Sequence, residues 1–127
     1  MLDLLKQLCS LNGVSGDEGE VRAFLRAQAE PYADSIRTDA LGNLIVFKKG
    51  TKSSGDHLLL AAHMDEIGLM VVNVSDDGFL SVAAIGGVDA AILPGLRVDV
   101  HATGVEHPLR GIVGRKPIHL ISAGERD

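Results

Sequence analysis

A short polar stretch, His63-Met64-Asp65-Glu66, separates two largely apolar runs at residues 58–62 and 67–72. Ionisable side chains at the end of a buried strand are costly unless a partner satisfies them. A metal ion bound by the histidine is one such partner. A turn that exposes the polar groups to water is the simpler alternative, and these four residues alone do not decide between the two.

The spacing of His63 and Asp65 favours cooperation between the two side chains. Residues i and i+2 of an extended chain point to the same side, which suits a metal-bound imidazole next to a carboxylate. If the chain bends after His63, the carboxylate reaches the other ring nitrogen and fixes the tautomer and orientation of the ring. Both arrangements remain open at this point.

Two helices are expected before this stretch. Leucines lie mainly on one helical face of residues 2–11, and this predicts an amphipathic helix with Cys9 on a packed face. Ser15 and Glu18 have the spacing of a capping box. The second helix should therefore start there and end near Pro31.

Short strands are expected at residues 35–39, 43–49 and 57–63, because each is rich in apolar or β-branched residues and is bounded by turn residues. Residues 57–63 are apolar without alternation, which predicts a central strand covered on both faces. Two helices followed by such strands predict an α/β layered domain.

The pattern changes after residue 66. Short strand-like segments follow one another closely, with turn residues at 76–78, 93–95 and 103–104. No helix of normal length fits here, so residues 67–127 are predicted to form a β-rich unit, a barrel or a sandwich. The polar stretch then lies at the junction with an α/β domain at 1–66, where pockets are common.

Composition excludes several classes of partner. The chain has 127 residues, 46% of them hydrophobic, and a net charge of −5 that comes from interspersed signs. Without a basic stripe we expect no nucleic-acid partner. No apolar run approaches the roughly 18 residues of a membrane span and no signal peptide is visible, so we expect no membrane partner. One cysteine suits a reducing cytoplasm.

Five blocks of sequence, taken together and in this order, carry a family resemblance. They are LNGVSGDEGEVR (11–22), DALGNLIVFKKG (39–50), LLLAAHMDEIGLMV (58–71), IGGVDAAILPGLRV (85–98) and GIVGRKPIHLIS (111–122). The chain resembles the tetrahedral metalloaminopeptidases, also described as glutamyl or deblocking aminopeptidases and often labelled cellulase or endoglucanase. The resemblance extends from Leu4 to about Arg126.

The resemblance implies a role for each residue of the polar stretch. His63 matches a metal ligand of a site for two divalent ions, usually zinc or cobalt. Asp65 matches the catalytic-site carboxylate that orients this ligand, and no catalytic role is implied for Glu66. The implied reaction is removal of the N-terminal residue from peptide substrates. In it the metal ions activate water and polarise the scissile carbonyl, and a glutamate transfers protons.

The resemblance also implies what the 127 residues lack. The family's remaining ligands lie far C-terminal to the first histidine, so we expect an N-terminal fragment that is inactive alone and requires the C-terminal portion. Residues 1–66 would begin the zinc-peptidase-like catalytic domain, and residues 67–127 would be part of an inserted β-rich dimerisation domain, which implies a homo-oligomer. The alternative is a non-catalytic oligomerisation or binding module derived from that family.

Other candidate residues have simpler explanations. A calcium site or a glycoside hydrolase would need more than paired acids such as Asp76-Asp77, which a β-turn explains. Aromatic residues for sugar stacking are nearly absent, at 3%. Surface or structural roles are expected for the four remaining histidines, His57, His101, His107 and His119.

Overall fold

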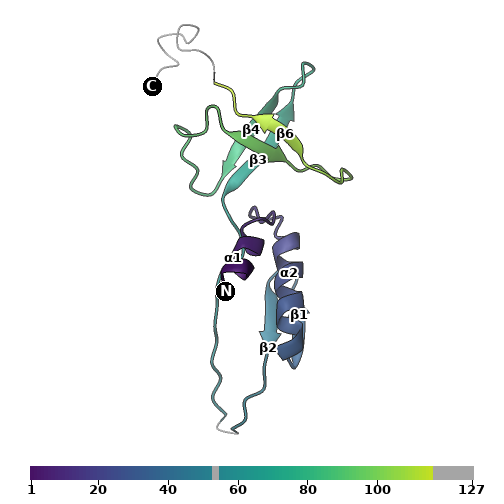
Figure 1. Cartoon of the computed structure of the whole chain (residues 1–127), viewed down its shortest axis with the longest axis vertical. Coiled ribbons are helices and arrows are strands. Elements are labelled where there is room, and N and C mark those ends of the chain that lie inside the picture. Colours follow the sequence, from purple (N-terminus) through teal and green to yellow (C-terminus); the bar gives the residue numbers. More distant parts are fainter. Residues whose placement is uncertain (53–54, 116–127) are drawn as a thin grey trace. The chain divides into compact units, whose positions relative to one another are not determined.

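The computed structural model describes residues 1–52 and 55–115, and these divide into two compact units, one over residues 1–88 and one from residue 89 onward. The first unit holds two helices and two hairpins, and the second holds one hairpin (Figure 1). The predicted α/β fold class is confirmed. His119, like the rest of residues 116–127, lies outside the described residues.

The first unit begins with two helices, α1 (Leu2–Leu8) and α2 (Gly19–Ala29), and a 3₁₀ turn at Glu30–Tyr32 continues α2. Pro31 lies within that turn, as its expected place at the helix end requires. Strands β1 (Ser35–Thr38) and β2 (Leu44–Phe47) pair antiparallel, and α2 packs against β2.

A second antiparallel hairpin follows in the same unit. Strands β3 (Gly68–Val74) and β4 (Leu80–Ile85) are joined by the predicted turn at Asp76-Asp77-Gly78. Gly78 has φ +82°, which only glycine adopts readily. The register shifts between Val71 and Asn73, so β3 contains a bulge.

The second unit is described by its hairpin, formed by β5 (Arg97–Val100) and β6 (Leu109–Ile112). Backbone hydrogen bonds from Gly95 N to Val113 O (2.8 Å) and from Val113 N to Leu96 O (2.9 Å) continue the pairing beyond the strand ends. The described residues from 67 onward contain no α-helix, as predicted. Because they form separate two-stranded sheets, the barrel or sandwich stays a prediction.

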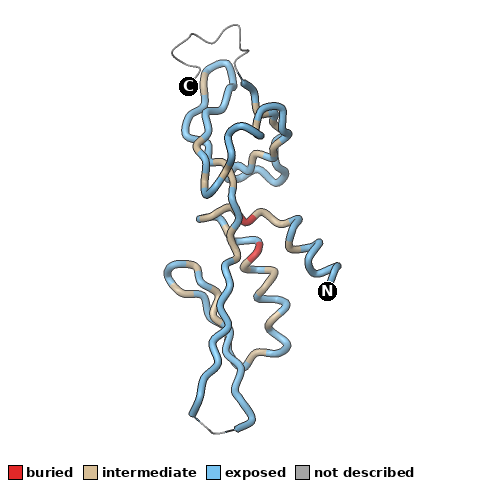
Figure 2. Tube along the Cα trace, turned by 90° about the vertical axis from the view of Figure 1, so that its left-hand side faces the viewer, coloured by how far each residue is buried: buried red, intermediate tan, exposed pale blue. Residues whose placement is uncertain are grey.

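The core of the first unit is small. Among the described residues, Val21 on α2 is the one buried hydrophobic side chain, at 7% exposure, and Gly13 is buried beside it (Figure 2). Helix α1 has no buried residue and Cys9 is exposed. The expectation of a packed Cys9 is therefore wrong, because no described element covers the leucine face of α1.

Two further expectations are wrong. Residues 57–63 form no strand, and Leu58, Leu59 and Leu60 are 85–87% exposed. A central strand needs hydrogen-bonding neighbours, and the described strands pair only within their own hairpins. The capping box is also absent: α2 begins at Gly19 without a side-chain cap, because the Ser15 hydroxyl bonds to Asp65 instead.

Candidate functional site

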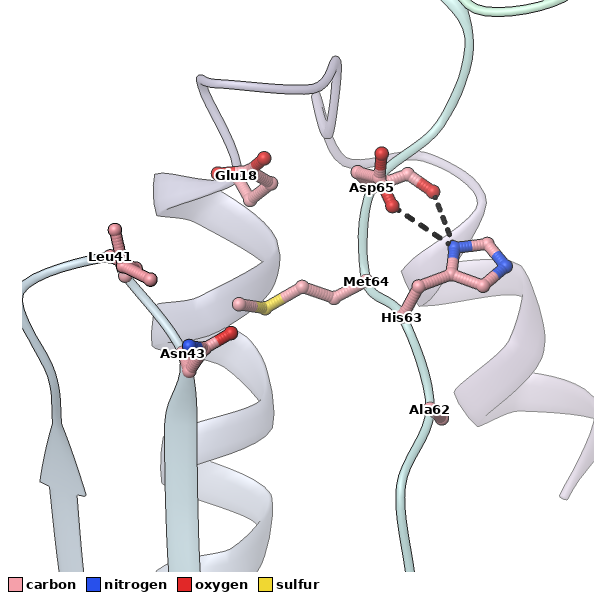
Figure 3. Close-up of a pocket in the computed structure, with 8 residues that line it drawn as sticks. Glu18, Leu41, Asn43, Ala62, His63, Met64 and Asp65 are labelled. Carbon is pink, nitrogen blue, oxygen red and sulfur yellow. Dashed lines mark hydrogen bonds and ion pairs between the residues drawn. The ribbon is translucent and has the colours of Figure 1, made fainter.

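His63 and Asp65 contact each other through the ring nitrogen Nδ1 (Figure 3). Nδ1 lies 3.1 Å from Asp65 Oδ1 and 3.0 Å from the Asp65 carbonyl oxygen. Both neighbours are acceptors, so the neutral ring with its proton on Nδ1 satisfies them and leaves the lone pair of Nε2 available. Nε2 points away from Asp65, and the ring is 85% exposed. Nε2 of the imidazole is therefore accessible to a cation.

The second carboxylate oxygen of Asp65 has its own partner, the hydroxyl of Ser15. Ser15 Oγ donates a hydrogen bond to Asp65 Oδ2 across 50 residues of sequence, in a partly buried position. This bond is the main cause that holds the pKa of the Asp65 carboxyl below its ordinary value, and desolvation opposes it more weakly. Asp65 is thus kept ionised, and both of its oxygens are engaged.

Backbone hydrogen bonds attach the loop that carries Ser15 to the segment that carries Asp65. Glu66 N donates to Gly13 O at 2.7 Å, and Ser15 N donates to Glu66 O at 3.3 Å. Val14 and Glu66 form a parallel β-bridge. The Glu66 side chain is exposed, and its backbone makes these contacts.

Glycine permits the close approach at this junction. A Cβ on Gly13 would lie 2.9 Å from Val21 Cγ2 and 3.4 Å from Met64 O. A Cβ on Gly68 would lie 2.6 Å from Val14 Cγ2. Real Cβ atoms do not reach such distances without displacing their neighbours. Small residues at 13 and 68 therefore let the loop dock next to the polar stretch.

An open pocket of about 160 Å³ lies beside the pair (Figure 3). The side chain of Met64 extends toward Asn43 and Glu18, on the side opposite to the His63 ring. Glu18 accepts a hydrogen bond from Gly16 N at 2.6 Å, and this bond is the main cause that lowers the pKa of its carboxyl. The pocket is lined by Glu18, Leu41, Gly42, Asn43, Ala62, His63, Met64 and Asp65.

The turn that forms one wall of this pocket is held by side chains. Asp39 Oδ1 accepts hydrogen bonds from the backbone of Leu41 (3.0 Å) and Asn43 (2.9 Å). Arg22 on α2 donates to Gly42 O at 2.9 Å. Gly42 has φ +88°, so the predicted turn between the first two strands is built around a glycine-only conformation.

The donor set of the described residues fits one metal ligand with its orienting carboxylate. A neutral imidazole whose Nδ1 donates to a carboxylate is the usual arrangement of a metal-binding histidine. Within residues 1–52 and 55–115, no group of three or more His, Cys, Asp or Glu side chains is placed to hold an ion. His57, His101 and His107 are all exposed, which is consistent with surface roles.

The sequence pattern does not predict the contact of Ser15 with Asp65. The spacing of Ser15 and Glu18 predicts a helix cap instead. The Ser15–Asp65 contact joins residues far apart in the sequence, and local periodicity carries no signal for such a contact.

Comparison with known proteins gives the family. Residues 42–127, well over half of the chain, match the model of the M42 glutamyl aminopeptidase family. The lysyl aminopeptidase of Pyrococcus furiosus is 37% identical over 119 residues, which cover 93% of this chain and 33% of the relative. The chain belongs to the M42 aminopeptidase family, as the resemblance predicted.

Solved structures agree in fold. An aminopeptidase from Desulfurococcus kamchatkensis has a TM-score of 0.86 and 38% identity, over 98% of this chain and 34% of that one. A Thermotoga maritima structure described as an endoglucanase has a TM-score of 0.78 and 46% identity, over 89% and 34%. The Pyrococcus horikoshii TET1 peptidase, which can assemble into a tetrahedron or a large octahedral shell, has a TM-score of 0.77 and 35% identity, over 99% and 36%.

The matched proteins are longer than this chain. The 127 residues span about a third of the relatives and solved structures that they match. Among the helices that the structure describes, none is long and apolar enough to cross a membrane.

Proposed function

We propose that this chain is part of a metal-dependent aminopeptidase that removes N-terminal residues from peptides. The carrying observation is the His63–Asp65 pair, with Nδ1 3.1 Å from Oδ1, in a chain of the M42 aminopeptidase family. His63 is the metal ligand in this proposal, and Asp65 is its orienting carboxylate.

The residues of this chain prepare the ligand. Asp65 accepts a hydrogen bond from Nδ1 of His63 through Oδ1 and through its carbonyl oxygen, which selects the tautomer and limits rotation of the ring. The ionised carboxylate makes the imidazole a stronger donor to a cation. When bound, two divalent ions, zinc or cobalt, would acidify a water molecule and polarise the scissile carbonyl.

The remaining ligands and the general base are proposed to come from outside the 127 residues, and the 127-residue segment alone to be inactive. This is supported by the single histidine–carboxylate pair among the described residues and by the length of the relatives. We assign residues 1–66 to the start of the catalytic domain. Residues 67–127 would be part of an inserted, barrel-like dimerisation domain.

The proposal includes a homo-oligomeric assembly and a cytoplasmic location. A homo-oligomer is supported by the TET1 peptidase of P. horikoshii, which can assemble into a tetrahedron or a large octahedral shell. A cytoplasmic location rests on the use of a single cysteine, Cys9.

The test compares two histidines at the ends of one extended segment. In the complete protein encoded by the gene, His63→Ala should remove peptide hydrolysis and lower the zinc content. His57→Ala is the control, because His57 is equally exposed and lies on the same segment. Aminopeptidase activity is measured on peptides with free and blocked N-termini, and metal content by mass spectrometry of the purified protein.

Two results would contradict the proposal. One is equal hydrolysis by His63→Ala and His57→Ala. The other is a complete protein that binds no stoichiometric metal and assembles without it, which would favour the non-catalytic oligomerisation module.

A further inference from the structure

The Asp65 carboxylate divides its two oxygens between two partners. Oδ1 lies 3.1 Å from His63 Nδ1, and Oδ2 accepts the hydrogen bond from Ser15 Oγ. The proposed function accounts for the first contact and leaves the second without a role.

A carboxylate with one partner keeps freedom to rotate about its last torsion angle. Asp65 is 41% exposed, so water competes for any oxygen that is not held. A hydroxyl donor on Oδ2 fixes the plane of the carboxylate, and this fixes the direction of Oδ1 toward the imidazole.

Docking of the loop does not require this hydroxyl. The backbone bonds between Gly13, Ser15 and Glu66 and the Val14–Glu66 bridge attach the loop by themselves. Removing the hydroxyl therefore leaves the backbone frame in place, which separates the proposed role from a purely structural one.

We propose that Ser15 is a positioning residue of the His63 metal site. Its hydroxyl holds the Asp65 carboxylate, and the carboxylate holds the His63 ring with Nε2 free for the metal. The inference rests on the proposed function, since the hydrogen bonds from Ser15 to Asp65 and from His63 to Asp65 affect metal binding only if His63 is a ligand.

The experiment measures zinc affinity of the complete protein at pH 8 by competition with a chelator. The matched pair is Ser15→Thr and Ser15→Val, because threonine and valine have nearly the same shape and differ in the hydroxyl. We expect Ser15→Thr to bind zinc like the parent. Ser15→Val should bind it roughly 3- to 10-fold more weakly, below the 10- to 100-fold typical of a direct carboxylate partner.

Two further variants test the route of the effect. Ser10→Ala is a control, because its hydroxyl bonds only to carbonyls of its own helix end, at Lys6 and Gln7, and zinc affinity should not change. In an Asp65→Ala background, Ser15→Val should produce no further loss of zinc affinity, because the carboxylate through which Ser15 acts is already absent. The visible absorption spectrum of the cobalt-loaded protein should shift in Ser15→Val and not in Ser15→Thr.

The possible results distinguish a failure of the Ser15 inference from a failure of the proposed function. Equal zinc affinity of Ser15→Val and Ser15→Thr would overturn the inference. So would a full additional loss in the Asp65→Ala background, which would mean that Ser15 acts by another route. If His63→Ala binds zinc like the parent protein, the proposed function fails first. Circular dichroism checks that each variant is folded.

Discussion

Asp65 contacts both His63 and Ser15 in the candidate site. It meets the His63 ring with one oxygen and the Ser15 hydroxyl with the other. The lowered pKa of its carboxyl, caused mainly by Ser15, extends toward lower pH the range in which Asp65 is a pure acceptor. An acceptor at this position favours the neutral tautomer of His63 with the proton on Nδ1.

Replacing Asp65 by Asn should therefore damage the site without removing bulk. The amide can present an N–H to Nδ1, which favours the wrong tautomer of the ring. We expect Asp65→Asn to weaken zinc binding by roughly 10- to 100-fold in the complete protein, measured by chelator competition. Asp56→Asn, on an exposed residue of the preceding segment, is the control, and equal affinity of the two variants would contradict the assignment.

The sequence allowed the His63–Asp65 pair to be predicted, but not its third member. The i, i+2 spacing predicts that the two side chains lie near each other, and the structure has the arrangement in which Oδ1 reaches Nδ1. Ser15 has a plausible local partner in Glu18 and a distant one in Asp65. Local spacing favoured the cap, and the tertiary contact prevailed.

At the scale of elements, the junction between the Ser15 loop and β3 depends on a glycine. A Cβ at Gly68 would lie 2.6 and 2.9 Å from the two γ-methyl groups of Val14, and valine is stiff about χ1. Gly68→Ala should destabilise the protein by about 1–3 kcal/mol, measured by urea unfolding.

Gly19→Ala is the matched control for this substitution. A Cβ there meets no atom within 4 Å, and alanine favours a helix, so stability should be unchanged or up to about 1 kcal/mol higher. Equal destabilisation by the two variants would argue against close packing at Gly68.

The β1–β2 hairpin has a pH-sensitive contact. Asp34 Oδ2 accepts a hydrogen bond from Lys49 N at 2.6 Å, and this bond is the main cause that lowers the pKa of the Asp34 carboxyl. Because the folded pKa lies below the unfolded value of about 3.9, the contribution to stability is present above that value. It is lost as the pH falls through the folded pKa.

We therefore expect the hairpin amides near Lys49 to be less protected from hydrogen exchange at pH 3 than at pH 6, after correction for the intrinsic rate. Asp34→Asn should lower protection at pH 6 and reduce the difference between the two pH values. An unchanged pH difference in Asp34→Asn would assign the acid sensitivity to other carboxylates.

Elements with local causes were predicted well. The β1–β2 and β3–β4 hairpins lie at the expected apolar runs and turn residues, the expected turn at 103–104 separates β5 from β6, and α2 ends beside Pro31. The expectation of a strand at 57–63 is wrong. An apolar run forms a strand only when neighbouring strands pair with it, and the run itself carries no information about whether such strands are present. The same holds for the leucine face of α1.

At the scale of the whole molecule, Leu58, Leu59 and Leu60 present a continuous apolar stretch that pairs with no strand of the described residues, and each is 85–87% exposed. Such a stretch promotes self-association. We expect the 127-residue chain, produced alone, to form large species in light scattering, and Leu59→Lys to reduce them.

Leu59→Lys should improve the behaviour of the 127-residue chain but destabilise the complete protein. If other parts of the complete protein pair with and cover residues 58–60, Leu59→Lys would bury a charge there and lower the melting temperature. A monodisperse 127-residue monomer, or a complete protein indifferent to Leu59→Lys, would contradict this picture.

The bridge between Val14 and Glu66 has a consequence for the order of folding. The helix α2 and the β1–β2 hairpin involve neighbours in the sequence, and such contacts close quickly. The bridge must close a loop of about fifty residues, at a larger cost in chain entropy. During synthesis, the stretch around His63 leaves the ribosome after both local elements, so we expect the proposed metal ligand to receive its orientation last, on a frame that has already formed.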